Sequence, residues 1–252
     1  QKTDVGQQRE NNQDSIYTLT SFIASDGRVE PFGLFIVADG MGGYKGGEKA
    51  SAIATRTAAD YILRNLYLPE IVPDPELPQD PINDILSTAV SKANNEVLEQ
   101  APESGTTITA AILMGNQAYF AHVGDSRAYI YNAHQLSQVT QDHSVVARMV
   151  EVGQITPEEA LTHKNRNVLY RAIGQTSTLE VDTYLHTIPA NSYLLICSDG
   201  LWNLVTDDEI NHRLHSPTSL DDCVTDLVDL ANEKGGDDNI SVILVGVGPE
   251  AG

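Results

Sequence analysis

Positive charge is scarce in this chain of 252 residues. It has 15 Lys and Arg residues against 35 Asp and Glu residues, which gives a formal net charge of −20. Because nucleic acids and anionic lipids attract proteins through basic patches, we expect neither a nucleic-acid partner nor a membrane partner. Most of the acidic residues are expected to form a solvated surface, so only a minority would be functional.

Cysteine is equally rare, since the chain has only Cys197 and Cys223, and they form no Cys-x-x-Cys pair. Six residues after each cysteine, where the phosphate-binding loop of a cysteine-based phosphatase needs arginine, the chain has Asn203 and Asp229. Both cysteines lie within apolar patterns, which favours buried thiols over a disulfide or a nucleophile. Buried free thiols fit a reducing compartment, and we expect a cytoplasmic protein.

Long apolar runs are also missing. No stretch approaches the roughly 20 apolar residues that a membrane-spanning helix needs, and no basic-then-apolar leader opens the chain. Apolar residues make up 41% of the sequence, which is ordinary for a globular protein. We therefore expect residues 1–252 to share one large core and to form a single domain.

Helical periodicity is present in several segments. Apolar residues recur at helical spacing, which predicts helices at residues 47–67, 82–100, 144–152 and 220–231. Capping boxes that begin at Thr156 and Thr206 predict two further helix starts. Between the first two helices, residues 68–81 interleave proline with acidic residues, and this pattern predicts a surface loop.

Short β-branched and aromatic runs predict strands. They lie at residues 34–38, 108–113, 118–123, 128–131, 193–197 and 240–247. The tight turn at Gly115-Asn116 indicates an antiparallel hairpin rather than a parallel crossover. Helices in pairs around many antiparallel strands indicate a layered α+β domain.

Aspartate stands at one end of several apolar runs, and the positions are Asp14, Asp39, Asp125, Asp199 and Asp238. Carboxylates that converge at strand ends repel one another unless a cation lies among them. Sites built from oxygen alone prefer Mg²⁺, Mn²⁺ or Ca²⁺. A single Asp-Gly pair predicts only a turn, but its repetition after buried runs favours a metal site.

Two other phosphate-handling motifs are excluded. The glycine-rich stretch after Asp39 is not a P-loop, because Glu48 stands where that motif needs lysine. A phosphoaspartate mechanism of the Asp-x-Asp type is absent at Asp39, since Met41 occupies the second aspartate position.

Six motifs occur in order along nearly the whole chain. They are Arg9-x-x-Asn12-Gln13-Asp14, Val37-Ala-Asp-Gly-Met-Gly-Gly43, Ser104-Gly-Thr-Thr107, His122-Val-Gly-Asp-Ser-Arg127, Ser198-Asp-Gly-Leu-Trp202 and Gly236-Asp-Asp-Asn-Ile240. Together they resemble the motif series of the metal-dependent protein phosphatases of type 2C, in their bacterial form. The resemblance implies one catalytic domain with a four-layer α-β-β-α sandwich, in which helix pairs flank two antiparallel sheets.

The resemblance also implies a set of metal ligands. Asp39 would bridge two core ions, Mn²⁺ or Mg²⁺, and the carbonyl of Gly40 would bind one of them. Asp199 and Asp238 would complete the shell of the second ion. Asp125 would hold a third, weaker ion and would share Asp199 with the core pair.

The remaining roles follow from the same resemblance. Asp14 would belong to the metal site and orient metal-bound water, and Arg9 would clamp the phosphate. Residues 144–174 would form a flap beside the site, and their part 153–174 is the most basic region of an acidic chain. Two cations about 3.5–4 Å apart would lower the pKa of a bridging water, so that hydroxide attacks phosphorus without a covalent intermediate.

The chain departs from the family pattern at three positions. Met41 stands where animal members carry a histidine proposed as the general acid, and Tyr44 stands where bacterial relatives often have histidine. The proton donor to the leaving group is thus unassigned, with metal-bound water as our hypothesis. Asn203 replaces a common acidic residue and is expected to alter only local hydrogen bonding. His122 and Trp202 are expected to be packing residues.

The prediction is therefore a Mn²⁺- or Mg²⁺-dependent phosphatase that acts on phosphoserine and phosphothreonine in proteins and opposes a bacterial serine/threonine kinase. We expect it to be a monomer. A first alternative is a non-catalytic relative that binds phosphoproteins or metal as a regulatory module. A second alternative is a structural Ca²⁺-binding domain without turnover.

Overall fold

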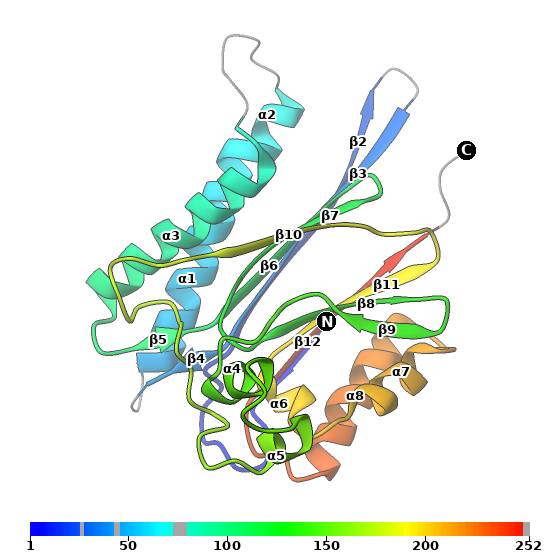
Figure 1. Ribbon diagram of the computed structural model, residues 1–252. Coiled ribbons are helices and arrows are strands. Elements are labelled where there is room, and N and C mark those ends of the chain that lie inside the picture. Colours follow the sequence, from blue (N-terminus) through cyan, green and yellow to red (C-terminus); the bar gives the residue numbers. More distant parts are fainter. Residues whose placement is uncertain (26–27, 43–45, 73–79, 249–252) are drawn as a thin grey trace.

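A computed structural model describes residues 1–25, 28–42, 46–72 and 80–248. Two five-stranded antiparallel sheets lie face to face, and helices cover the outer face of each sheet (Figure 1). This arrangement is the predicted four-layer α-β-β-α sandwich. Within the described residues, no helix is both long enough and apolar enough to cross a membrane.

The first sheet has the strand order β10-β7-β6-β3-β2. Its strands are β2 (Ser15–Ser25), β3 (Arg28–Ala38), β6 (Ile108–Met114), β7 (Gln117–Val123) and β10 (Asp182–Thr187). The predicted hairpin between β6 and β7 is confirmed, and Gly115 at its turn has a φ of 58°. Sequence patterns had not indicated β10, and of β2 they had indicated only the apolar start that follows Asp14.

The second sheet has the order β1-β12-β11-β8-β9. Its strands are β1 (Lys2–Asp4), β8 (Arg127–Asn132), β9 (Gln135–Gln138), β11 (Ser192–Cys197) and β12 (Ile240–Val247). Pairing of β1 with β12 joins the beginning of the described chain to its end. A separate short ladder of β4 (Gly40–Met41) and β5 (Gly105–Thr106) lies at one end of the sandwich.

Helices α1 (Gly46–Ile62) and α3 (Ile82–Gln100) pack on the first sheet and on each other. Helices α6 (Asp199–Trp202), α7 (Asp207–Leu214) and α8 (Leu220–Glu233) lie on the second sheet. The predicted helix pairs are thereby confirmed, including both ends of the 82–100 helix.

The loop was predicted to begin at residue 68, but helical structure continues to Ile71. After α1 the chain continues through one wider π-helical turn, η1 (Leu63–Tyr67), and then α2 (Leu68–Ile71). Pro69 is tolerated there because it lies in the first turn of α2, where its missing N–H costs no helical hydrogen bond. Residues 73–79 of the predicted loop lie outside the described residues.

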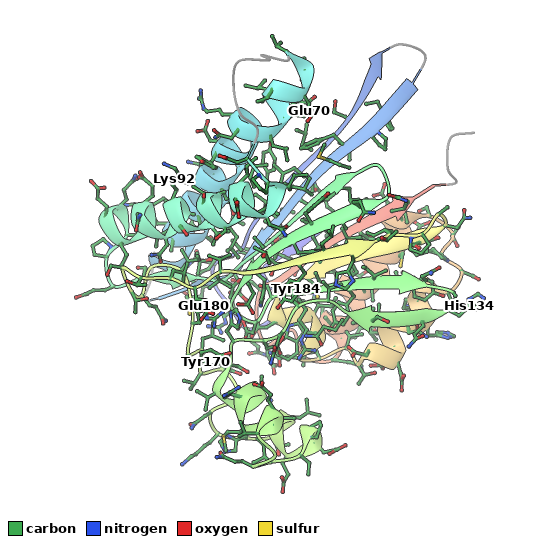
Figure 2. The ribbon with its side chains drawn as sticks, turned by 45° about the horizontal axis from the view of Figure 1, so that its top comes forward. Glu70, Lys92, His134, Tyr170, Glu180 and Tyr184 are labelled. Carbon is green, nitrogen blue, oxygen red and sulfur yellow. The ribbon has the colours of Figure 1, made fainter. Side chains whose placement is uncertain are left out.

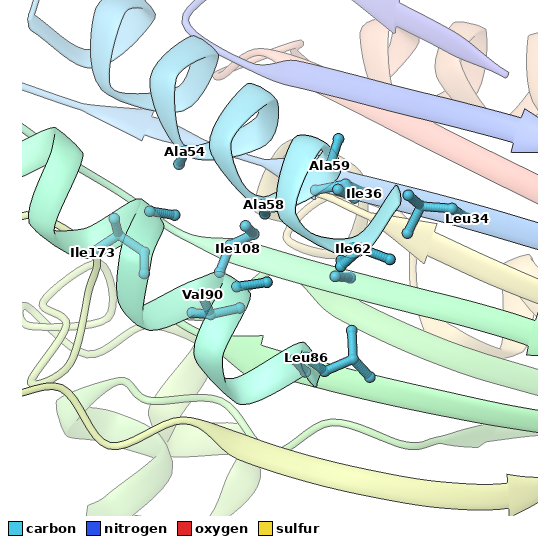
Figure 3. Close-up of a cluster of buried hydrophobic side chains, with 14 of the residues drawn as sticks. Leu34, Ile36, Ala54, Ala58, Ala59, Ile62, Leu86, Val90, Ile108 and Ile173 are labelled. Carbon is cyan, nitrogen blue, oxygen red and sulfur yellow. The ribbon is translucent and has the colours of Figure 1, made fainter. Parts of the chain in front are cut away.

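Three apolar cores hold the four layers together. The core beneath α1 and α3 contains many alanines, and Ala54 and Ala58 let the helices approach the sheet closely near Leu34 and Ile36 of β3 (Figure 3). Phe35 and Phe120 lie in the core between the two sheets. The third core fills the space between the second sheet and α8.

A flap of residues 144–174 projects from one end of the sandwich, with Tyr170 near its base (Figure 2). It contains α4 (Val145–Glu151) and α5 (Pro157–Leu161). Ser144 caps α4, and Thr156 forms the predicted capping box with Glu159 at α5. Isolated bridges Ser144–Leu169 and Thr106–Ile173 fasten the two ends of the flap to each other and to the sandwich.

Candidate metal centre and phosphate site

The five predicted aspartates converge at one end of the sandwich. Asp14 precedes β2 and Asp39 follows β3, and the adjacent residues Ser15 and Ala38 are paired in the sheet. The other three aspartates also lie close enough to Asp39 that each raises its pKa. Antiparallel pairing thus brings together residues that are far apart in the sequence.

The backbone at Asp39 is fixed from both sides. Its N–H donates to Thr107 Oγ1 at 2.9 Å, and its carbonyl accepts a bond from Thr106 Oγ1 at 2.8 Å. The carbonyl also accepts from the N–H of Thr107 at 2.8 Å. Both threonines are buried, so they hold the Asp39 side chain at a defined position at the end of β3.

Gly40 lies where no side chain fits. A Cβ atom at this position would be 2.2 Å from the carbonyl oxygen of Gly47 and 2.4 Å from that of Gln13. The start of α1 and the segment before β2 therefore both pack directly against the Gly40 backbone. This close approach explains the glycine after Asp39. Gly43 and Tyr44 of the same motif lie outside the described residues.

Asp14 is held by Ser198, which belongs to the fifth motif but had no role assigned from the sequence. Its Oδ2 accepts a hydrogen bond from Ser198 Oγ at 2.9 Å, and Ser198 Oγ in turn accepts one from the N–H of Ser241 at 2.9 Å. Its Oδ1 is buried and has no hydrogen-bond partner. Burial is the largest cause that raises the pKa of Asp14 to about 7.

Asn239 is a second residue that the motif reading left without a role. Its side chain accepts a bond from the N–H of Gln13 at 2.8 Å and donates to the carbonyls of Val5 at 2.9 Å and Asn11 at 3.0 Å. It therefore fastens the segment that carries Arg9 and Asp14 to the start of β12. Its position in the sixth motif was the only signal that could have pointed to it.

Asp199 begins helix α6 directly after strand β11. Its Oδ2 accepts a hydrogen bond from Asn203 Nδ2 at 3.1 Å, whereas its Oδ1 is buried without a partner. Burial, followed by the carboxylate of Asp238, raises the pKa of Asp199 to about 6. Asn203 therefore acts as a local hydrogen-bond donor to Asp199.

Asp125 is the most enclosed of the five, with 6% of its surface exposed. Burial, with Asp199 as the next cause, raises its pKa well above the ordinary value. Trp202 Nε1 donates to the Asp125 carbonyl at 2.9 Å, so the predicted packing residue also holds the loop between β7 and β8. Arg127 lies over the Trp202 ring, with its guanidinium carbon 3.6 Å from the centroid.

His122 is a core histidine, as predicted. It is fully buried, and its Nε2 lies 3.0 Å from the Gly124 carbonyl and 3.1 Å from the Gln141 carbonyl. Burial lowers its pKa to about 3, so the ring is neutral and Nε2 carries the proton. His122 therefore supports the loop that precedes Asp125 and takes no direct part in the site.

Arg9 forms an ion pair with one of the candidate ligands. Its Nη2 donates to Asp238 Oδ2 at 2.6 Å. The Arg9 side chain is 51% exposed, so its guanidinium remains reachable from solvent. The hydrogen bond to Asp238 is the largest cause that raises the pKa of Arg9.

The donor set fits a hard divalent cation. Among the described residues, no three His, Cys, Asp or Glu side chains lie close enough together to hold a metal ion as they stand. However, Asp14 and Asp199 are buried carboxylates that repel each other, and each keeps one oxygen without a partner. A cation that binds between such carboxylates stabilises them. The donors are all oxygens, which suits Mg²⁺ or Mn²⁺.

Known proteins resemble this chain over almost its full length. A model of the family described as "Protein phosphatase 2C" matches residues 6–244. The serine/threonine phosphatase Stp of Listeria monocytogenes is 35% identical over 250 residues, which are 97% of this chain and 93% of the relative.

Solved structures give the same result at the level of the fold. The serine/threonine phosphatase of S. agalactiae superposes with a TM-score of 0.80 at 34% identity, with 97% of each chain covered. The catalytic domain of the phosphatase PstP, solved with two manganese ions, superposes with a TM-score of 0.77 at 31% identity. That match covers 96% of this chain and 94% of the PstP domain.

Proposed function

This chain belongs to the protein phosphatase 2C family and is a protein serine/threonine phosphatase. From that premise we propose that it hydrolyses phosphoserine and phosphothreonine in one step, by a hydroxide that bound divalent cations provide. The observation that carries the proposal is the convergence of five aspartates beside one half-exposed arginine.

The proposed ligands are the residues that the fold brings to this end. Asp39 and the Gly40 carbonyl would hold one core ion, and Asp39, Asp199 and Asp238 the other. Asp125, with Asp199 shared, would hold a third and weaker ion. When bound, Mn²⁺ or Mg²⁺ lowers the pKa of coordinated water and neutralises charge on phosphoryl oxygens. Support for this ligand set comes from the unpartnered oxygens and the two manganese ions in the related PstP structure.

Arg9 would bind the phosphoryl group. Its guanidinium stays charged at any pH at which the protein is folded, and its planar fork matches two phosphate oxygens. It is paired with Asp238, so it is held at the site rather than extended into solvent. A dianionic phosphate could take over this contact, because the Arg9 side chain is half-exposed.

Asp14 would orient the attacking water. Ser198 occupies its Oδ2, which leaves the buried Oδ1 as the oxygen that could accept a hydrogen bond from that water. The donor of a proton to the leaving serine or threonine oxygen has no assignment among these residues.

We also propose that residues 1–252 act as one catalytic domain. The pairing of β1 with β12 and the anchoring of the first segment by Asn239 support this proposal. A counterpart serine/threonine kinase, a monomeric state and a cytoplasmic location stay predictions.

The proposal is tested by phosphate release from a phosphothreonine peptide, with Mn²⁺ titrated against an EDTA control. We expect turnover that rises with Mn²⁺ and vanishes in EDTA, and we expect Asp199→Asn to abolish it. Asp60→Asn is the matched control, because Asp60 lies on the surface of α1 in an exposed pair with Arg64. Full activity in Asp199→Asn, or in EDTA, would contradict the mechanism.

A further inference from the structure

A pocket lies beneath the flap, on the side of the sandwich that carries Trp202. It has a volume of ≈ 480 Å³, which is within the range of about 300–1,000 Å³ typical of small-ligand sites. The mechanism above makes no use of it. One wall belongs to flap helices α4 and α5, and the other belongs to the second sheet and α6.

The flap wall of the pocket is apolar. Val146 and Val150 of α4 line it together with Pro157, Ala160 and Leu161 of α5. Leu161 is 61% exposed, so most of its side chain is free to contact a ligand. These residues come from both flap helices, so one whole wall of the pocket is apolar, whereas the opposite wall carries polar residues such as Gln138 and Thr140.

Three of the four charged side chains that line the pocket form ion pairs. Arg127 donates to both carboxylate oxygens of Asp142, with a shortest distance of 2.7 Å, and both side chains are largely buried. Arg166 donates to the carbonyl of Leu161 at 3.2 Å, and Glu151 pairs with Arg148 at 2.5 Å. Arg166 donates to a neutral carbonyl, which does not neutralise its charge, whereas the wall formed by α4 and α5 favours an uncharged, apolar group.

The pocket shares two residues with the candidate metal centre. Trp202 lines the pocket and donates to the Asp125 carbonyl, and Asn203 lines it and donates to Asp199 Oδ2. A phosphorylated residue bound at the centre would therefore have its sequence neighbours beside the pocket. An extended peptide advances at most about 3.3–3.6 Å per residue, so only a flanking position at the matching distance from the phosphorylated residue would meet the pocket.

We propose that this pocket is a subsite for an apolar side chain, such as leucine, that flanks the phosphorylated residue of a protein substrate. The proposal rests on the proposed function and adds a sequence preference to it. Phosphate and divalent cations would occupy the centre, and the side chain would pack between Leu161 and Trp202. The free energy of that burial would favour such substrates over peptides with small polar neighbours.

The test uses phosphothreonine peptides in which a single leucine is moved through the flanking positions of an otherwise alanine sequence. For the wild-type protein with Mn²⁺, we expect one position at which leucine raises kcat/KM by about tenfold. In Leu161→Ser and in the nearly isosteric Val150→Thr, the preference should fall to about twofold or less. Hydrolysis of p-nitrophenyl phosphate, which has no flanking residue, should be unchanged in both variants.

Val168→Ser is the matched control. Val168 is also an apolar flap residue with 47% of its surface exposed, but it does not line the pocket. A leucine preference that survives in Leu161→Ser and Val150→Thr, or that is absent at every position in the wild type, would overturn the subsite while leaving the phosphatase mechanism intact. Failure of the wild type to hydrolyse any of these substrates would overturn the proposed function and the subsite with it.

Discussion

At the scale of single residues, the site depends on contacts between positions that are very distant in the sequence. Arg9 reaches Asp238, and Ser198 reaches Asp14, over separations of 229 and 184 residues. The aspartates were identified because carboxylates at the ends of apolar runs suit a metal site, and the family resemblance assigned Arg9 to the phosphate. Ser198 and Asn239 could not be assigned in this way, since their roles depend on which backbone and side-chain atoms face them after folding.

The pairing of Arg9 with Asp238 leads to a prediction about both ligands of the site. Arg9→Gln should bind inorganic phosphate about tenfold more weakly, because a charge-assisted hydrogen bond is lost. The same variant should bind Mn²⁺ more tightly in the absence of phosphate, because a competing positive charge leaves Asp238. Isothermal titration with each ligand separates the two effects.

Arg64→Gln serves as the control for that experiment, since Arg64 forms an exposed pair with Asp60 on α1. Its affinities for phosphate and Mn²⁺ should match those of the wild type. Weaker Mn²⁺ binding in Arg9→Gln would show that the arginine organises Asp238 rather than competing for it.

At the scale of elements, the sequence predicted those helices, caps and turns whose formation depends on residues close together in the chain. The 82–100 helix, the capping boxes at Thr156 and Thr206, and the β6–β7 hairpin were all identified from their own residues. Strand β10 was missed because its exposed residues carry no alternating apolar pattern, and its place at the sheet edge depends on pairing with β7. The helix predicted over residues 47–67 covers α1 and η1, but α2 was missed because the proline density after residue 68 outweighed the helical signal before it.

The end of β7 also carries a pH-dependent contribution to stability. His122 is neutral in the folded protein, and burial lowers its pKa from 6.5 to about 3. Its contribution to stability is therefore fully present above pH 6.5 and is lost as the pH falls toward 3. At pH 5 the loss from this residue should be about 2 kcal/mol of unfolding free energy.

Two measurements check this prediction. An NMR titration of the His122 ring in the folded protein should show no protonation above pH 4, and urea unfolding should give the pH dependence. The comparison of wild type with His122→Gln isolates the histidine, because buried aspartates titrate in both proteins. A ring that titrates near pH 6.5 would contradict the buried, neutral state.

At the scale of the whole molecule, the carboxylates of the metal centre lower the stability of the folded protein until a cation binds. Burial and four neighbouring carboxylates raise the pKa of Asp39 well above its ordinary value. At neutral pH an ionised Asp39 is thus disfavoured in the folded protein but not in the unfolded chain. The fold tolerates this unfavourable free energy because three separate apolar cores stabilise its layers.

Asp39→Asn should consequently be more stable than the wild type in EDTA, although it should lose phosphatase activity. Saturating Mn²⁺ at about 100 times its Kd should add ~2.7 kcal/mol to the wild type, or roughly 5–10 °C in Tm, and little to the variant. Thermal unfolding in EDTA and in Mn²⁺ measures both shifts, with Asp60→Asn as the surface control. A variant that is less stable in EDTA and still gains the full Mn²⁺ shift would refute this account.

The adjacency of the first and last strands has a consequence for synthesis on the ribosome. Arg9 and Asp14 emerge from the ribosome long before Asp238 and Asn239. Most of both sheets can form before β12 is available to receive β1 and to fasten the segment between them. A nascent chain that has not reached β12 would therefore lack part of its cation site and the anchor of its arginine, so catalysis would begin only after β12 has been synthesised.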